Sequence, residues 1–138
     1  MSLRDDLRAA FYNVLLTQFP TIDIGLDNQK FEQPKDTQFM EVWFKEISSK
    51  QASIGTTNKF KRHMGYFVVE CFVPEKSGTK DLWDMCGDVS DAFEDQNYTL
   101  TDGSYVTTLT PEVFGNGKKN GFYSRIVMIK YILDAAPR

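Results

Sequence analysis

The stretch FMEVWFKEISSKQASIGTTNKFKRHMGYFVVECFV, residues 39–73, decides the fold of this chain. Its first part, 39–47, alternates between two faces and places Met40, Val42 and Phe44 on the same side, which predicts a β-strand. Its last part, 61–73, predicts a second and longer strand, which Pro74 and the following turn close. The two strands therefore form a hairpin with a long insertion between them.

The insertion is basic and poor in apolar residues. Residues 48–60 form the expected loop, and its basic side chains, together with those at the start of the next strand, are Lys50, Lys59, Lys61 and Arg62. No acidic residue occurs between Glu46 and Glu70. Compact domains rarely keep structureless loops longer than about 12–15 residues unless the loops have a function. We therefore expect this loop to contact a partner.

Two helices are expected around this hairpin. Residues 3–18 repeat apolar side chains at helical spacing, with Ser2 as the expected N-cap and Pro20 as the end. A second helix is expected from Thr79, as its cap, to about Glu94. Its apolar stripe consists of Leu82, Met85, Cys86, Val89 and Phe93.

Two further strands complete the expected fold. Residues 104–110 and 122–133 read as strands, and the glycine-rich GNGKKNG between them reads as a hairpin end. The order of elements predicts an α+β fold: an antiparallel β-sheet of about four strands, with two main helices packed on one face and the long loop between the first two strands. Residues 1–138 form a single domain. Both faces of the last strand are apolar, so we expect a neighbouring subunit to cover part of the second face.

Composition excludes several classes of protein. The chain has 138 residues, of which 41% are hydrophobic and 14% aromatic, as expected for one soluble globular domain. No apolar run is long enough to cross a bilayer. Asp5 and Asp6 interrupt the layout of a signal peptide, so we expect a cytoplasmic protein in which Cys71 and Cys86 remain thiols.

Charge is distributed unevenly along the chain. The formal net charge is −3, but residues 81–117 contain eight acidic residues and no Lys or Arg. The basic loop and a smaller basic pair, Lys118 and Lys119, oppose this acidic region. Such segregated charge favours pairing between copies of the chain.

The second helix carries an acidic row. Its members are spaced 3, 4, 3 and 4 residues apart and share one face: Asp81, Asp84, Asp88, Asp91 and Asp95. Like charges at this spacing destabilise a helix, and acids near its C-terminus oppose the helix dipole. Two interpretations stay open, a solvated face and a surface that meets a positive partner. Metal binding is a weaker third, because every ligand would come from one helix face.

No catalytic pattern is found. His63 is the only histidine and lies in strand-like sequence, and no serine or cysteine has the neighbours of a nucleophile. GNGKK differs from a phosphate-binding loop, because Glu112 and Lys119 stand where Gly and Ser or Thr are required. We therefore expect no enzyme, no cofactor and no metal.

Several short motifs resemble one family. They are the loop start Gln51–Gly55, the basic cluster Lys61 and Arg62, Gly65 in the long strand, Pro74 with the Gly78–Thr79 turn, and the aromatic pair Phe122 and Tyr123. Together they resemble the tail terminator proteins of long-tailed bacteriophages, over nearly the whole chain.

The resemblance implies a structural protein of the virion, assembled in the host cytoplasm. Members form a six-subunit ring at the head-proximal end of the tail tube, end tube polymerisation and present a surface to the neck. The implied partners are copies of the chain, the tail tube protein, a head-completion or neck protein and, transiently, DNA in the lumen, but no membrane. The expected contact residues are Lys50, Gln51, Lys59, Lys61, Arg62, Asp81, Asp84, Asp88, Asp91, Lys118 and Lys119.

Other functions compete with this one. A neck or head-completion protein and a tail tube subunit stay within virion assembly, although tube subunits commit more of their chain to strands. A small enzyme or ligand-binding domain lacks a supporting group of residues. A nucleic-acid-binding module is disfavoured by the net charge, and a steep salt dependence of DNA binding would revive it.

Overall fold

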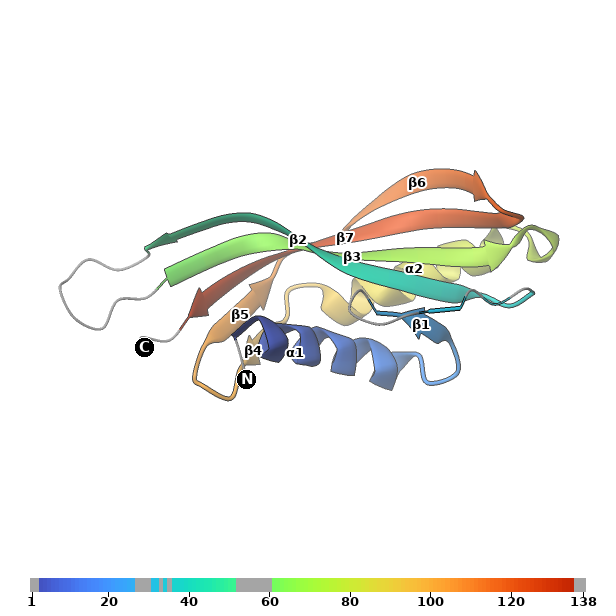
Figure 1. Cartoon of the computed structure of the whole chain (residues 1–138). Helices are drawn as coiled ribbons and strands as arrows, with labels where there is room; N and C mark the ends of the chain where they lie inside the picture. Colours follow the sequence, from blue (N-terminus) through green and yellow to red (C-terminus); the bar gives the residue numbers. More distant parts are fainter. Residues whose placement is uncertain (1–2, 27–30, 33, 35, 52–60, 136–138) are drawn as a thin grey trace.

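The computed structural model describes residues 3–26, 31–32, 34, 36–51 and 61–135. Figure 1 shows a long twisted sheet with two helices. In chain order the elements are α1 (Leu3–Gln18), β1 (Asp23–Gly25), β2 (Phe39–Gln51), β3 (Lys61–Pro74), the short 3-10 helix η1 (Glu75–Ser77), α2 (Lys80–Phe93), β4 (Asn97–Thr99), β5 (Tyr105–Thr108), β6 (Glu112–Lys119) and β7 (Phe122–Ala135).

The sheet is larger and more varied than expected. Its seven described strands run in the order β1-β2-β3-β7-β5-β4, and β6 pairs with β7 off this path. One edge of β7 is paired with β3 along its whole length, whereas the other edge is shared by β5 at residues 131–134 and by β6 at residues 122–128. Because β1 runs parallel to β2, the sheet is mixed. The chain is α+β, but the prediction of an antiparallel sheet of about four strands is wrong.

The glycine-rich segment before β7 belongs to β6, a strand that the sequence did not lead us to expect. Residues 115–119 belong to β6, and a register shift between Gly115 and Gly117 lets the strand continue past the glycines. The turn that joins β6 to β7 consists only of Asn120 and Gly121, with φ of 51° and 83°. This is the left-handed geometry of a two-residue hairpin turn, for which Asn-Gly is the favoured sequence.

Both helices occur where helical spacing predicts them. Leu7, Phe11 and Leu15 of α1 are buried, and so is the whole apolar stripe of α2. Thr79 occupies the N-cap position of α2, but its side chain makes no capping hydrogen bond and its backbone is already helical. Thr79 is therefore the N-cap residue by position, but its side chain does not form a capping hydrogen bond.

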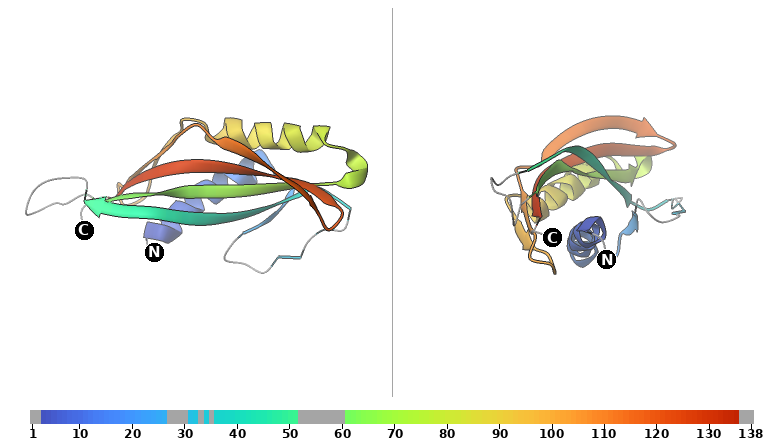
Figure 2. Two further views of the ribbon diagram at one scale, coloured as in Figure 1. Left: turned by 90° about the horizontal axis from the view of Figure 1, so that it is seen from above. Right: turned by 60° about the vertical axis from the view of Figure 1, so that its left-hand side comes forward.

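The core lies between the helices and the face of the sheet that curls toward them (Figure 2). Phe11 of α1 is fully buried, and its ring stacks on Phe67 at 5.0 Å and meets Phe93 of α2 at 5.7 Å between centroids. Side chains from both helices and from β2, β3, β5 and β7 belong to this one cluster. The aromatic and β-branched side chains of the long strands thus form the apolar sheet face on which both helices pack.

The opposite face of the sheet has a small cluster of its own. Phe39, Phe72 and Phe122 are buried there, with Phe31 packed against them. Phe122 is therefore covered by its own chain, not by the neighbouring subunit that the sequence led us to expect. On the same face Ile126, Met128 and Ile132 are half-buried.

Candidate functional site

The basic hairpin end is partly sheet, not loop. Strand β2 continues to Gln51 and β3 begins at Lys61, so residues 48–51 of the expected loop are strand. In the register, Lys50 opposes Arg62 and Gln51 opposes Lys61. Lys59 lies outside the described residues, as do the side chains of Lys50, Gln51 and Lys61. The structure thus brings the ends of the two basic strands together at one end of the sheet (Figure 1).

Arg62 is bound within its own chain. Its Nε and Nη2 donate hydrogen bonds to Oδ1 and Oδ2 of Asp134, at 2.8 and 3.2 Å. The hydrogen bond and the charge of Asp134 raise the pKa of Arg62 further above its usual range. Arg62 therefore ties β3 to β7 at the base of the hairpin end, a role that its sequence neighbours do not indicate.

The acidic residues of α2 form a ridge, defined here as Asp81, Asp84, Asp88 and Asp91. All four are exposed. Lys80 donates a hydrogen bond from Nζ to Oδ2 of Asp84 at 2.9 Å, and this contact raises the pKa of Lys80. Lys80 thus neutralises one member of the ridge locally. Asp95, the fifth acid of the predicted row, lies beyond the end of α2 and has a φ of 48°.

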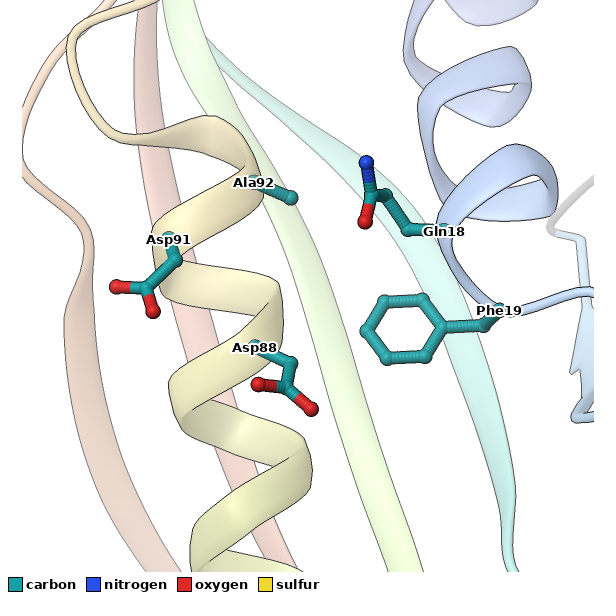
Figure 3. A pocket seen from close by; sticks show the side chains of 5 residues that line it. All are labelled: Gln18, Phe19, Asp88, Asp91 and Ala92. Atoms are coloured by element: carbon teal, nitrogen blue, oxygen red, sulfur yellow. The ribbon is translucent and has the colours of Figure 1, made fainter.

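The ridge borders a groove between the two helices (Figure 3). Its volume is about 270 Å³, and it is lined by Gln18, Phe19, Asp88, Asp91 and Ala92. The Asp88 carboxylate points toward the side chains from α1, whereas Asp91 points to the other side of α2. The Asp88 carboxylate near the Phe19 ring offers a place for a cationic side chain with an apolar stem.

A second groove lies at the start of α2, beside β1. It has a volume of about 530 Å³ and is lined by residues from four segments: Thr21, Asp23, Asp36, Thr37, Gln38, Val73, Pro74, Ser77 and Asp81. Lys76 approaches it, with Nζ 3.4 Å from Oδ1 of Asp36. Lys80 also lies near Asp81, but it is hydrogen-bonded to Asp84, so the three carboxylates leave this side of the molecule acidic.

A basic and aromatic surface lies at β6. Lys118 Nζ stands 5.4 Å from the centre of the Tyr123 ring, and Arg125 Cζ lies 3.6 Å from the centre of the Trp83 ring. Trp83 is 55% exposed despite its size. Sequence reasoning named Lys118 and Lys119, whose side chain lies outside the described part, but missed Arg125 and Trp83. The sequence held one signal for this surface: Trp83, a large aromatic residue of α2, lies outside the apolar stripe of that helix.

The chemically reactive residues are buried or scattered. Cys71 and Cys86 are free and buried, and the hydrogen bond to Cys86 together with burial raises the pKa of Cys71. His63 Nδ1 is 3.9 Å from Oε1 of Glu46, on neighbouring strands. Within the described ranges, no group of three or more His, Cys, Asp or Glu is placed to hold a metal ion.

In the part of the chain that the structure describes, no helix combines the length and the apolar character that crossing a membrane requires.

The comparisons with known proteins agree with the resemblance of the motifs. A sequence model of the phage tail terminator protein family matches residues 4–131. The chain belongs to this family. The predicted resemblance is therefore confirmed, and a phage tail terminator protein has a structural role in the tail, in line with the absence of a catalytic pattern in the sequence.

The fold of this terminator protein also occurs in another solved structure. That protein has a TM-score of 0.75 with 17% identity, and the match covers 100% of this chain and 99% of the other. At this identity the likeness concerns the fold alone. A search of curated proteins gives no match.

Proposed function

We propose that this terminator protein forms a ring on the head-proximal end of the tail tube, ends tube polymerisation there and presents the surface to which the head joins. The observation that carries the proposal is the family match over residues 4–131. The proposed setting is the virion, at the junction of head and tail. The ring surrounds a lumen in which DNA makes only transient, non-specific contacts.

The charge distribution supports assembly with identical copies. A ring built head to tail uses two different surfaces of each subunit. This chain has an acidic side, with the ridge and the two grooves, and basic surfaces at β6 and at the hairpin end. Opposite charges on separate surfaces steer association and fix its orientation.

The hairpin end is the proposed arm of the ring. Lys50, Lys59 and Lys61 provide its basic character, Gln51 adds a neutral polar side chain, and Arg62 anchors its base through Asp134. The arm and the acidic ridge are the proposed contacts to the next subunit, the tail tube or the neck. Half-buried apolar residues on the outer sheet face add a further surface that a partner would cover.

Tube polymerisation in vitro tests the proposal. Purified tail tube protein is polymerised with increasing amounts of this protein, and tube lengths are measured by electron microscopy. We expect the mean length to fall as the molar ratio rises, with a ring at one end of each tube. Unchanged lengths, or incorporation along the tube, would contradict a terminator and favour a neck protein or a tube subunit, respectively.

A charge-reversed variant locates the contact. Asp88→Lys with Asp91→Lys reverses the part of the ridge that lines the groove, and we expect it to remain folded but to lose the effect on tube length. Asp84 is left unchanged because it already pairs with Lys80. The matched control is Glu32→Lys with Glu75→Lys, the same charge change at two exposed acids outside α2.

A further inference from the structure

One row of paired residues crosses five strands of the sheet. In the register Ile24 opposes Met40, Met40 opposes Cys71, Cys71 opposes Arg125, and Arg125 opposes Gly115. The row begins on β1 and ends on β6, so these two strands lie at the same height on opposite sides of the sheet. Figure 1 shows both strands at the end of the sheet remote from the hairpin end.

Both strands form edges of the described sheet, and their directions are complementary. Among the described residues β1 pairs only with β2, and β6 pairs only with β7. Because β1 is parallel to β2 while the β2-β3, β3-β7 and β7-β6 pairs are antiparallel, β6 runs antiparallel to β1. When two copies lie side by side in the same orientation, β6 of one copy therefore runs antiparallel to β1 of the next. Antiparallel pairing is the more stable way for two edge strands to pair.

The two edges also carry opposite charge. Lys118 lies on β6 and Arg125 on the neighbouring β7, where it stacks on the exposed Trp83. Beside β1 lies the second groove, with the carboxylates of Asp23, Asp36 and Asp81. Tryptophan and arginine are the residues that most often anchor protein interfaces.

We infer that β6 of one copy lies along the β1 edge of the next copy, with Lys118 and Arg125 facing the acidic groove. The inference rests on the proposed ring and names its subunit contact. Since the two edges differ, the contact is head to tail and closes into a ring or continues as a filament according to the angle between copies. The exposed side chains of Val113 and Phe114, 36% and 46% exposed on β6, become covered in this contact.

The edge contact gives the hairpin end a direction. Neighbours that meet at the sheet edges place the strands across the circumference of the ring, so the β2-β3 hairpin end points away from the contact between copies. The β6 surface therefore meets the next copy, and the basic arm is left for the tube, the head-side component or DNA in the lumen.

Zero-length cross-linking tests the contact in the assembled protein. Tails are assembled with an equal mixture of ¹⁴N- and ¹⁵N-labelled terminator protein and treated with a carbodiimide, which joins lysine to carboxylate. We expect isotopically mixed peptide pairs that join Lys118 to Asp23, Asp36 or Asp81. Mixed pairs that join only other residues would overturn the edge contact and leave the ring intact. A complete lack of mixed pairs would overturn the ring as well.

Charge reversal provides a second measurement. We expect Lys118→Glu to weaken self-association at least about tenfold by light scattering, and Lys118→Glu combined with Asp23→Lys to recover most of the loss. The matched control is Lys45→Glu. Lys45 is exposed and lies on β2, outside the residues that pair with β1. Equal effects of Lys118→Glu and Lys45→Glu would contradict the inference.

Discussion

Arg62 of β3 and Asp134 of β7 form a two-point ion pair across neighbouring strands. Nε lies 2.8 Å from Oδ1 and Nη2 lies 3.2 Å from Oδ2, and the two residues are direct partners in the register. Their side chains are 41% and 31% exposed. The pair stands where the basic hairpin leaves the sheet, so it fixes the base of the proposed arm.

Asp134→Asn should loosen this base without unfolding the protein. The substitution removes the charge that Arg62 faces, and partly exposed ion pairs contribute little to global stability. We expect faster amide hydrogen exchange at residues 61–66 and little change in the thermal midpoint. Asp36→Asn removes an exposed acid paired with Lys76 and should leave exchange at 61–66 unaltered. Identical exchange in both variants would show that the pair does not order the hairpin base.

Two glycines should respond in opposite directions to alanine. A Cβ at Gly65 would stand 2.7 Å from the backbone oxygen of Lys45 and 2.7 Å from the hydroxyl oxygen of Tyr131, so Gly65→Ala should lower the free energy of unfolding by about 1–3 kcal/mol. Gly87 is helical with nothing within 4 Å, so Gly87→Ala should raise it by about 0.5–1 kcal/mol. Urea denaturation measures both, and a neutral Gly65→Ala would refute the close approach of β2 and β3.

Phe11 should be the most sensitive position of the core. Its ring lies within 5.8 Å of five other aromatic rings and is fully buried. Phe11→Ala should cost about 3–5 kcal/mol, and Phe11→Leu clearly less, because leucine refills part of the space. The comparison is made by denaturant unfolding, with Leu16→Ala, a 52% exposed position on the same helix, as the control.

Tyr98 should make the protein less stable at alkaline pH. Burial raises the pKa of Tyr98 above its ordinary value of about 10. The unfolded chain therefore loses this proton first, so the stabilisation is complete below pH 10 and is lost as the pH rises toward the folded pKa. We expect the free energy of unfolding to fall less steeply between about pH 9 and 11 in Tyr98→Phe than in the wild type. Tyr105→Phe, at a 44% exposed tyrosine, is the control for the loss of a tyrosine hydroxyl group.

Periodicity predicts the parts of this fold that are long and amphipathic. Both helices and the strands β2, β3 and β7 have enough repeats to be recognised locally. Strands β1 and β4 have three residues each, too few for alternation to appear. Strand β6 contains two glycines and ends in lysines, which resembles a loop until its pairing with β7 is known. The parallel partnership of β1 depends on contacts with residues far along the chain, which no local pattern encodes.

The candidate site likewise has some features that sequence spacing predicts and others that only the fold reveals. The acidic ridge follows from helical spacing, and the contact of Lys80 with Asp84 follows from their separation of four residues. The pair of Arg62 with Asp134, 72 residues apart, and the stacking of Arg125 on Trp83 require the sheet register and the helix position. Sequence therefore indicates which charges exist, and the fold decides which of them remain available to a partner.

The most direct test of the terminator function is electron microscopy of phage particles produced with this gene switched off, with tail length and head attachment scored. The account predicts tubes of irregular and excessive length together with separate, DNA-filled heads. Tails of normal length that fail to join heads, or a complete absence of tubes, would contradict it.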